Sequence, residues 1–356
     1  MAVRVLTDFH HSSLLRSLIM LFEDRLGMEV YRPIGMQWFA EGYWAINNQY
    51  DTAKQYLSMD QVPSDGTPVL NREHKKPKPL NTPKNKEKGI FYCYDPGGTD
   101  VNRACTLDFF KNKRFDYLIA SIPAHIPLYK RLISEYHPSA KLIVQMGNEW
   151  PFEFWEGNNI LASVKPRQIE SANAIFYHQE FSTKIFKPTP CRPTKKVYSF
   201  VNVLQNMPQA QGDFDELERL LKPYGYEFGS YGGQNRDGNM NGPRELADKM
   251  HDAEFILHSK PGGDGFGHII FNAYAVGRPV ITRSSQYRER LAEELLVPGT
   301  YIDLDKLGHT LTAQAIQAHG LDKLEQMGKR ASERFQEVVN YEKEAEEIAG
   351  WLTRLK

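Results

Sequence analysis

The sequence has little cysteine and no excess of charge of either sign. Its 356 residues include three cysteines, Cys93, Cys105 and Cys191, which are far apart and lack the spacing of a zinc site. An odd and scattered set favours a reducing compartment over a disulfide framework. Lysine plus arginine and aspartate plus glutamate both count 44. No global field therefore draws the chain to nucleic acid or to an anionic membrane, and any such affinity would come from a local patch.

Long apolar runs and a recognisable leader are also missing. Nowhere do about 18 consecutive apolar residues occur, which is the length that a membrane-spanning helix needs. The N-terminus enters a strand-like segment directly, without a basic region followed by a long apolar one. We therefore expect a cytoplasmic protein with no transmembrane segment.

The signatures of several enzyme classes are absent as well. There is no Walker loop, no G-x-S-x-G elbow and no histidine or cysteine cluster that suggests zinc. Asp213 with Asp215, and Asp303 with Asp305, resemble a metal-binding D-x-D pair. Both pairs stand directly before helical patterns, where an aspartate caps free N–H groups. We expect helix caps at these positions and no bound metal.

What the sequence does have is an alternation of short β-branched segments with helical patterns. A chain of 356 residues is long enough for two domains, and the alternation predicts parallel sheets covered by helices on both faces. The strand-like segments are residues 3–9, 28–31, 117–122, 141–146 and 174–177 in the first half, and 197–203, 226–231, 255–258 and 279–282 in the second. The helical patterns of the second half are residues 214–221, 244–251, 267–276, 286–296 and the charged stretch 322–356.

Two segments without hydrophobic periodicity interrupt this alternation. Residues 187–196, KPTPCRPTKK, hold three prolines and predict a semi-rigid hinge. We place one domain at 1–190, a second at 191–335, and a C-terminal helix that is free to return to the first domain at 336–356. Residues 72–88 are rich in lysine and proline and predict a mobile basic insertion. A solvated loop and a contact to phosphate or nucleic acid are the two interpretations of that insertion.

The most distinctive segment is residues 258–281, HSKPGGDGFGHIIFNAYAVGRPVI. A strand-like stretch ends here, four glycines follow and an apolar helix begins. In a parallel sheet such a loop lies at the carboxyl ends of the strands, where ligands bind. N–H groups at the start of the helix, and glycines that let the backbone come close, suit a phosphate or diphosphate. A nicotinamide dinucleotide is disfavoured, because His268 stands where the third glycine of G-x-G-x-x-G belongs and Arg283 follows the next strand.

The same segment resembles the donor-binding signature of GT-B glycosyltransferases of the group 1 family, which is approximately E-G-F-G, then E-A-M-A and G-x-P-V. The matching residues are 264–267 (DGFG), 272–275 (NAYA) and 277–281 (GRPVI). The resemblance implies a GT-B fold, in which two Rossmann-like domains have parallel sheets that face each other across a cleft. It also implies a metal-independent, hexosyltransferase-like enzyme that moves a sugar from a UDP- or GDP-sugar to an acceptor hydroxyl, with no other cofactor.

The resemblance assigns the domain at 191–335 to the nucleotide sugar. Asp264 takes the place of the family's first acidic residue, which contacts the donor sugar, and we include it among the catalytic candidates. Asn272 replaces the second acidic residue, which holds the ribose; an amide still bonds to hydroxyls, but without the strength of a carboxylate. Lys260 and Arg283 are candidate diphosphate partners, with plain surface charge as the alternative. The donor-binding candidates are Gly233, His258, Lys260, Gly262, Gly263, Gly265, Phe266, Gly267, His268, Asn272 and Arg283.

In the family the first domain, here residues 1–190, binds the acceptor. His10 and His11 follow its first strand, and a histidine there could take the proton of the attacking hydroxyl. Capping of the next helix is the alternative for these two histidines. The candidate acceptor contacts at other strand ends are Asp95, His125, Glu149 and Trp150. The tryptophans of this half either stack on a sugar or a base or belong to the core.

Three other functions stay open at this point. A nucleotide-sugar epimerase of the same fold would convert the donor without an acceptor. A DNA-modifying glycosyltransferase would use the basic insertion and the tryptophans on a hydroxymethylated base. A non-catalytic protein would bind the nucleotide sugar without turnover. The stereochemistry of transfer, retaining or inverting, is also open.

Overall fold

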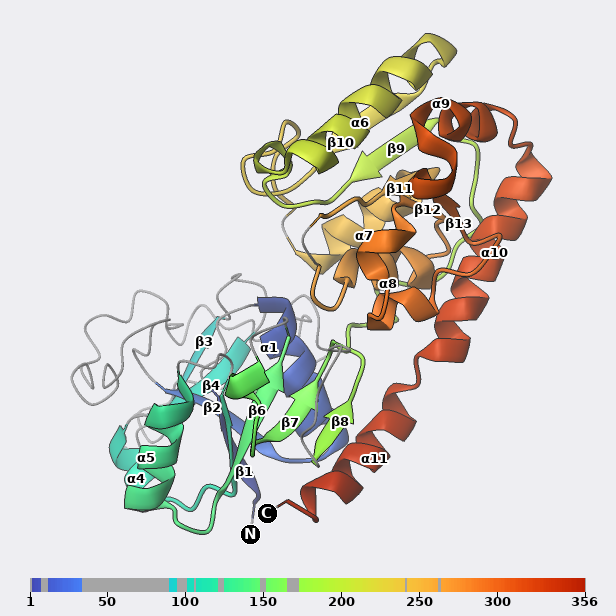
Figure 1. Cartoon of the computed structure of the whole chain (residues 1–356). Helices are drawn as coiled ribbons and strands as arrows, with labels where there is room; N and C mark the ends of the chain where they lie inside the picture. Colours follow the sequence, from blue (N-terminus) through green and yellow to red (C-terminus); the bar gives the residue numbers. More distant parts are fainter. Residues whose placement is uncertain are drawn as a thin grey trace, which may run out of the picture. The chain divides into compact units, whose positions relative to one another are not determined.

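The chain forms two compact units in the computed structural model. The structure describes residues 2–7, 12–33, 90–94, 101–105, 107–120, 125–147, 152–164, 173–240, 242–261 and 264–355. One unit comprises Met1–Phe181 with Tyr341–Lys356, and the other comprises Ser182–Asn340 (Figure 1). The chain thus divides after residues 181 and 340, whereas the sequence places the divisions after 190 and 335. The predicted basic insertion at 72–88 lies outside the described residues.

The first unit is built on an eight-stranded sheet. Its strand order is β3-β4-β2-β1-β5-β6-β7-β8, and all neighbouring strands are parallel except β3 and β4. The strands are β1 (Arg4–Thr7), β2 (Glu29–Pro33), β3 (Ile90–Tyr94), β4 (Val101–Cys105), β5 (Tyr117–Ala120), β6 (Lys141–Met146), β7 (Asn159–Ala162) and β8 (Ala174–Phe176). The helical segments are α1 (Ser12–Ile19), the π-helical η1 (Met20–Arg25), α4 (Leu107–Asn112), α5 (Ile126–Tyr136), η5 (Phe152–Phe154) and α11 (Tyr341–Leu352).

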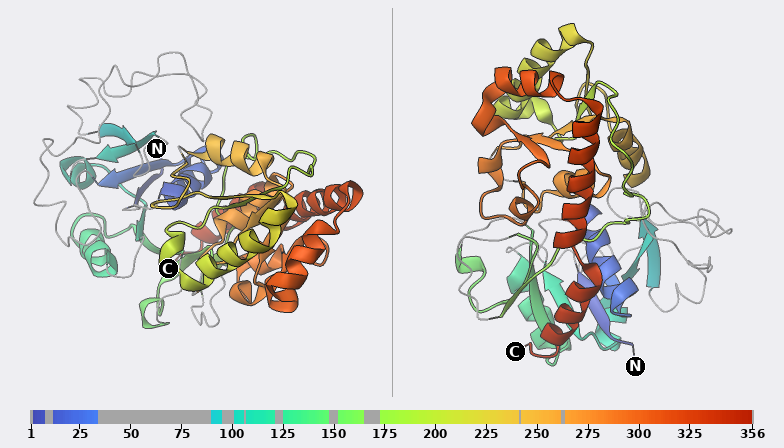
Figure 2. Two further views of the ribbon diagram at one scale, coloured as in Figure 1. Left: turned by 90° about the horizontal axis from the view of Figure 1, so that it is seen from above. Right: turned by 90° about the vertical axis from the view of Figure 1, so that its right-hand side faces the viewer.

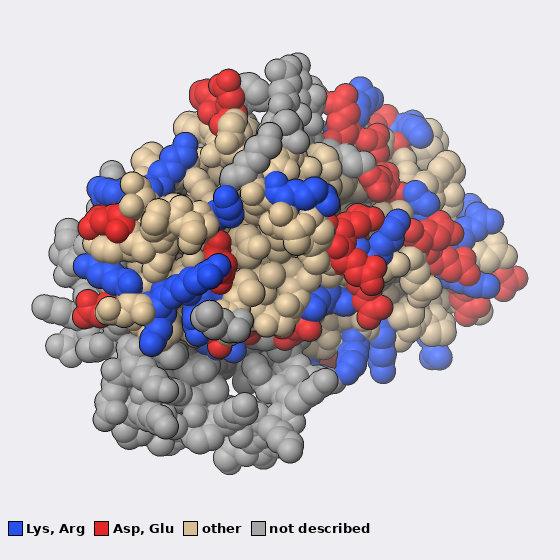
Figure 3. All heavy atoms as spheres, turned by 90° about the horizontal axis from the view of Figure 1, so that it is seen from below, with Lys and Arg blue, Asp and Glu red and all other residues tan. Residues whose placement is uncertain are grey.

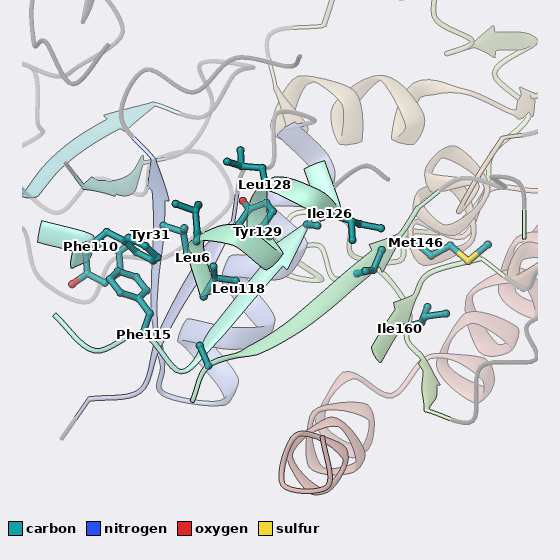
Figure 4. Packing of buried hydrophobic residues seen from close by; sticks show 14 of the residues in the cluster. Leu6, Tyr31, Phe110, Phe115, Leu118, Ile126, Leu128, Tyr129, Met146 and Ile160 are labelled. Carbon is teal, nitrogen blue, oxygen red and sulfur yellow. The ribbon is translucent and has the colours of Figure 1, made fainter. Parts of the chain in front are cut away.

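The central strands of this sheet are buried on both faces, which explains their short runs of valine, isoleucine and leucine. Adjacent residues of one strand point to opposite faces. Leu6 and Leu118 pack with residues of α4 and α5, whereas Val5 and Ile119 pack with residues of α1. Figure 4 shows the first of these clusters, where side chains of α5 such as Tyr129 meet those of the strands. Two apolar layers therefore hold helices against both faces, as the alternation predicts.

The last helix, α11, packs into the core of the first unit. Trp351 and Leu352 belong to the apolar cluster that contains α1, and Trp351 is almost fully buried. The carboxylate of Glu344 accepts hydrogen bonds from the backbone N–H and the imidazole Nδ1 of His178, both at 2.8 Å. Apolar burial and this doubly bonded carboxylate therefore fix the end of the chain on the unit in which it begins.

The second unit has a five-stranded, fully parallel sheet in the order β10-β9-β11-β12-β13. Its strands are β9 (Lys196–Ser199), β10 (Glu227–Ser230), β11 (Phe255–Leu257), β12 (Val280–Thr282) and β13 (Tyr301–Asp303). Its helices are α6 (Pro208–Leu221), α7 (Pro243–Asp252), α8 (His268–Ala275), α9 (Leu304–Gln317) and α10 (Leu321–Val338), with short turns η6 (Leu204–Asn206), η7 (Lys222–Tyr224), η8 (Ser284–Tyr287) and η9 (Leu291–Glu294).

Helices cover both faces of this second sheet (Figures 1 and 2). Helices α6, α9 and α10 share one apolar cluster with the strands, to which Val197 of β9 belongs. Helix α7 lies on the other face, where the ammonium of Lys249 is 5.6 Å from the centre of the Tyr198 ring. Each unit therefore has the α/β layering that the sequence predicts.

The proline-rich segment 187–196 is fastened to the second unit and does not stand free as a hinge. Arg278 donates to the carbonyl of Thr189 at 2.9 Å and to that of His251 at 2.7 Å. Cys191 is 1% exposed within the apolar cluster of α6, and burial raises the pKa of its thiol to about 12. Thr194 also donates its hydroxyl to the Asp252 carbonyl at 2.9 Å, and polar contacts of this kind follow no hydrophobic period.

The helical prediction for residues 286–296 is wrong. The structure has two 3-10 turns there, η8 and η9, separated by Glu289 with a φ angle of +60°. The Glu289 N–H donates to the Glu293 carboxylate at 2.6 Å instead of to a helical carbonyl. The apolar spacing is helical, but the left-handed backbone at Glu289 interrupts the helix.

The C-terminal region holds more helices than the charge pattern predicts. The charged stretch from residue 322 onward is split into α10 and α11, because Val339 has extended φ and ψ angles of −105° and 117°. Helix α9 has no counterpart in the prediction. Gly308 inside it has non-helical angles, with φ 61° and ψ −179°, and this kink interrupts the periodicity that would have indicated a helix.

The described surface carries both charges. On the face shown in Figure 3, basic and acidic side chains lie side by side, as the equal counts of 44 lead us to expect. Within the described part of the chain, no helix combines the length and hydropathy that crossing a membrane requires.

Candidate functional site

The candidate site lies at the carboxyl edge of the second sheet, where the strand order reverses. The chain runs from β9 to its neighbour β10 on one side, and then to β11 on the other side. The loops after β9 and β11 therefore diverge, and ligands of such sheets bind in the crevice between the diverging loops. The glycine-rich loop follows β11 directly. It thus occupies the position at which the topology favours a ligand.

The backbone of this loop needs glycine at two described positions. Gly265 and Gly267 have φ angles of +55° and +85°, in the left-handed region that favours glycine. Gly267 is the N-cap of α8, and its N–H donates to the carbonyl of Asp264 at 3.1 Å. No side chain in the described part of the chain caps this helix. The Ile270 N–H donates to the Gly267 carbonyl at 2.9 Å, and the N–H groups before it have no intrahelical partner and are open to the loop or to a ligand.

The carboxylate of Asp264 is held from several sides by its own chain. Lys260 Nζ lies 2.7 Å from Oδ1, and His258 Nε2 lies 2.6 Å from Oδ2. The Tyr287 hydroxyl donates to Oδ2 at 3.3 Å, and the Asp264 side chain is 8% exposed. Burial acts to raise the pKa of Asp264, but the charges and hydrogen bonds of His258 and Lys260 outweigh burial and hold that pKa below its usual range. The carboxylate is therefore ionised at neutral pH.

His258 and Lys260 are also tied to the segment around β12. The Thr282 hydroxyl donates to the His258 carbonyl at 2.5 Å, and the Lys260 N–H donates to Gln286 Oε1 at 2.7 Å. His258 is 1% exposed, whereas the Lys260 side chain is 30% exposed. An ammonium has three donors and Asp264 takes one of them. Lys260 can therefore still donate to a ligand at the mouth of the loop.

Three other signature residues face the interior. Phe266 is buried and stacks on Phe271, with ring centroids 4.2 Å apart. His268 packs edge-on against Phe266 at 5.0 Å. Asn272 is 6% exposed, and its Oδ1 has no hydrogen-bond partner among the described residues. A buried acceptor without a donor is costly, so Asn272 Oδ1 could accept a hydrogen bond from a ligand.

Arg283 is engaged by carboxylates of its own chain. Its guanidinium donates to the two oxygens of Asp213 at 2.7 and 2.9 Å, and to Asp305 Oδ1 at 3.1 Å. Asp213 also accepts hydrogen bonds from Ser259 at 2.6 Å and from His309 at 2.8 Å. The hydrogen bonds that Arg283 donates to Asp213 raise the pKa of Arg283. The predicted contact of Arg283 with a diphosphate would require this network to open.

The aspartate that anchors this network does not cap a helix, contrary to the sequence-based expectation. Helix α6 begins at Pro208, which suits the first helical position because it needs no N–H there. Asp213 therefore lies inside α6, with its side chain 2% exposed. Asp303, in contrast, is the N-cap of α9 and accepts from the Asp305 N–H at 3.1 Å, so the capping prediction is confirmed for Asp303.

Gly233 lies in a loop that is bonded to the segment after β9. Asn202 Oδ1 accepts a hydrogen bond from the Gly233 N–H. Asn235 donates to the Val201 carbonyl at 2.7 Å and accepts from the Leu204 N–H at 2.8 Å. A Cβ on Gly233 would lie 2.9 Å from Asn202 Oδ1. Close packing between two loops beside the switch point therefore accounts for this glycine.

The other predicted site residues lie elsewhere. His125 is 4% exposed and precedes α5 without capping it through its side chain. The remaining predicted residues lie outside the described part of the chain: His10, His11, Asp95, Glu149, Trp150, Gly262 and Gly263. The structure therefore brings together the predicted His258, Lys260 and Asp264, and adds Tyr287 and Gln286, for which the sequence carries no signal.

Replacing Gly267 by alanine should destabilise the second unit by about 1–2 kcal/mol, because the left-handed region is costly for a residue with a Cβ. The added Cβ would also lie 3.1 Å from the Ala292 Cβ. Urea titration measures the free energy of unfolding. Gly212→Ala is the matched control: Gly212 lies inside α6 with nothing within 4 Å of an added Cβ, and alanine there should stabilise by about 0.5–1 kcal/mol. Effects of the same sign at both positions would contradict this account of the loop.

Comparison with solved structures identifies the fold. HepE from Anabaena, in complex with UDP and glucose, matches over 100% of both chains at 12% identity with a TM-score of 0.60. Sucrose-phosphate synthase from Thermosynechococcus elongatus matches over 99% of both chains at 10% identity and 0.61. The α-glucosyltransferase AGT, in complex with UDP, matches over 99% of this chain and 100% of its own at 11% identity and 0.60. No protein-family model and no curated protein matches the sequence. The chain has the GT-B fold, so the predicted fold class is confirmed, and likeness at this level of identity shows the fold alone.

Proposed function

We propose that this protein transfers a sugar from a nucleoside-diphosphate sugar to an acceptor hydroxyl, with the donor at the glycine-rich loop of the second unit. The observation that carries the proposal is the loop at 258–267. It stands at the switch point of a GT-B sheet, opens a helix without a side-chain cap, and fixes a lysine by a buried carboxylate. Two of the similar structures contain UDP, which makes a UDP-sugar the first donor to test.

The chemistry asks the loop to stabilise a leaving group. The bond from the anomeric carbon to the diphosphate oxygen breaks, and a bond from that carbon to the acceptor oxygen forms. The departing diphosphate gains negative charge, which N–H groups at the start of α8 and the ammonium of Lys260 would stabilise. Lys260 is better placed for this than Arg283, because the donors of Arg283 are already bonded to Asp213 and Asp305. The chain itself then supplies the positive charge, without a metal ion.

Asp264 has room for one further contact in this scheme. A carboxylate offers about four lone-pair positions, and Lys260, His258 and Tyr287 already occupy three on Asp264. A sugar hydroxyl can donate to the remaining position on Oδ1. Asp264 would thus orient the donor sugar and hold the ammonium of Lys260 beside the diphosphate.

Asn272 is the proposed ribose contact. Its buried Oδ1 lacks a donor among the described residues, and a ribose hydroxyl supplies one. A neutral amide in place of a carboxylate makes this contact weaker than a charge-assisted bond. The affinity for the nucleotide would then depend more on the diphosphate than on the ribose.

The first unit is the proposed acceptor side. Its strand order reverses between β1 and β5, because the chain passes from β1 to β2 on one side and later to β5 on the other. His10 and His11, which follow β1 in the sequence, remain the candidates for the base that takes the proton of the acceptor hydroxyl.

Nucleotide binding and release test the proposal directly. UDP at 100 times its Kd should stabilise the protein by about 2.7 kcal/mol, which raises the thermal midpoint. The same measurement with GDP shows whether the site prefers uracil or guanine. UDP release from UDP-glucose should then increase when a suitable acceptor hydroxyl is added. The proposal would be contradicted if UDP and GDP left the thermal midpoint unchanged and no nucleotide were released from UDP- or GDP-sugars. Conversion of the donor without nucleotide release would indicate an epimerase instead.

A further inference from the structure

A groove in the second unit lies along the free edge of its sheet. It has a volume of about 600 Å³ and is bounded by β13 with the turn before it, by α9 and by α10. β13 is the last strand in the sheet order, with β12 between it and β11. We call this feature the α10 groove. Its size is in the range of pockets that hold a small molecule.

One face of α10 lines the groove with positive charge. Lys323 and Arg330 are two helical turns apart and both border the groove. Neither forms a hydrogen bond or an ion pair with the residues that the structure describes. Lys306 of α9 adds a third cation, 3.7 Å from Asp303. Asp303 also lines the groove and accepts from Ser284 at 2.8 Å, so one negative charge there faces the three positive charges of Lys306, Lys323 and Arg330.

A glycine leaves room for one of these cations. Gly299, in the turn before β13, has a φ angle of +87°, and a Cβ added there would lie 2.7 Å from Arg330 Nη1. The guanidinium therefore lies directly against the backbone of this turn. A Cβ at 299 would push the end of the Arg330 side chain aside, so glycine at this turn leaves the guanidinium room beside the groove.

The inner wall of the groove is apolar and contains one polar atom without a partner. Ile302 and Met327 line the groove and are 5% and 6% exposed. The Nδ1 of His319 is buried and has no hydrogen-bond partner among the described residues. Burial, followed by the charge of Lys323, lowers the pKa of His319, so this ring is neutral at pH 7. The groove thus combines cations at its rim with an apolar interior and a free ring nitrogen.

We propose that the α10 groove binds a small organic phosphate monoester, with its phosphate at Lys323 and Arg330 and its apolar body against Met327 and Ile302. A phosphate dianion balances two unpaired cations, and the guanidinium fork matches phosphate oxygens. The apolar wall favours an organic ester over inorganic phosphate. This site shares no lining residue with the loop at 258–267, so it does not rest on the proposed sugar transfer.

Phenyl phosphate is the probe, because it joins a phosphate to an apolar ring. Calorimetric titration of the full chain should show that phenyl phosphate binds about tenfold or more tightly than inorganic phosphate, which lacks the ring, or phenol, which lacks the phosphate. Lys323→Gln and Arg330→Gln should each weaken phenyl phosphate about tenfold, because each removes a charge-assisted hydrogen bond. Lys329→Gln is the control, since Lys329 pairs with Glu333 at 3.7 Å and does not line the groove.

The methyl resonance of Met327 gives a readout that is specific to the groove. Its assignment comes from Met327→Leu, a substitution of similar volume. The resonance should shift when phenyl phosphate is added to the wild type, and this test stands even if one charge variant fails to fold. The proposal would be overturned if the wild type and Lys323→Gln bound phenyl phosphate with equal affinity, or if the Met327 resonance did not shift at saturation. Binding of the probe at another place would not rescue it.

Discussion

Asp264→Asn should lower UDP release from the sugar donor about 100-fold or more, which is the size of effect that removal of a preorganised electrostatic group produces. The amide keeps the shape of the carboxylate but loses the charge that holds Lys260 at 2.7 Å and His258 at 2.6 Å. Lys260 then leaves the place where the diphosphate would sit, and the sugar loses an ionised partner. Initial rates of UDP formation at saturating donor measure the effect.

A second carboxylate in the same unit provides the control for this prediction. Asp252 accepts two hydrogen bonds from Lys196 at 3.0 and 2.8 Å, and so resembles Asp264 as a partner of lysine. Lys196 begins β9, so this pair is at the amino edge of the sheet and away from the loop at 258–267. Asp252→Asn should keep its activity within about twofold. If Asp264→Asn also kept its activity within that range, the loop would not hold the reacting part of the donor.

The fold was predictable because it depends on patterns that are local. Predictions for β6 and β11 agree with the structure to within a residue or so, since strands buried on both faces are short apolar runs. The patterns that misled are those in which a single residue departs from helical geometry. Residues 286–296 have helical spacing, yet Glu289 has a φ angle of +60° and the helix does not form, and Gly308 likewise kinks α9.

The candidate site was predictable only in part, because many of its contacts join residues that are far apart in the sequence. His258, Lys260 and Asp264 are close in the sequence, and a resemblance of a short motif could place them in one loop. The partners Tyr287 and Asp213 come from other segments. Ser259 and Asp213 are 46 positions apart in the chain, and His309 and Asp213 are 96 apart. No periodicity or motif links such residues, because the folded sheet alone brings their elements together.

Asp213→Ala should lower the free energy of unfolding by about 3 kcal/mol, because it breaks a buried ion pair by removing one partner. The Asp213 carboxylate is 2% exposed and the Arg283 side chain is 18% exposed. Without Asp213, the guanidinium keeps, among the described residues, the contact with Asp305 at 3.1 Å, and Ser259 and His309 each lose an acceptor. Urea titration at pH 7 measures the loss.

Glu216→Ala is the control for this prediction, because it removes an ion pair of α6 that is exposed to solvent. Glu216 is also bonded in a bidentate manner, by Arg219 at 2.8 and 2.6 Å, but both side chains are exposed. Solvent screens such a pair, so the urea midpoint should hardly change. An equal loss in the two variants would show that burial does not set the strength of the Asp213 network.

The pH dependence of this difference follows from the pKa of Asp213. Burial acts to raise that pKa, but hydrogen bonds from Arg283, Ser259 and His309 hold it below its usual value. In the unfolded chain an aspartate titrates at about 3.9. The ionised carboxylate therefore stabilises the fold above that pH, and its contribution is lost as the pH falls through the lower pKa of the folded state. The gap between the wild type and Asp213→Ala should be full at pH 7 and should shrink below about pH 4, as the wild type takes up the proton that the variant cannot bind. A gap that widened on acidification would mean that the pKa of Asp213 in the folded protein lies above that of the unfolded chain, which would contradict its stabilisation by Arg283, Ser259 and His309.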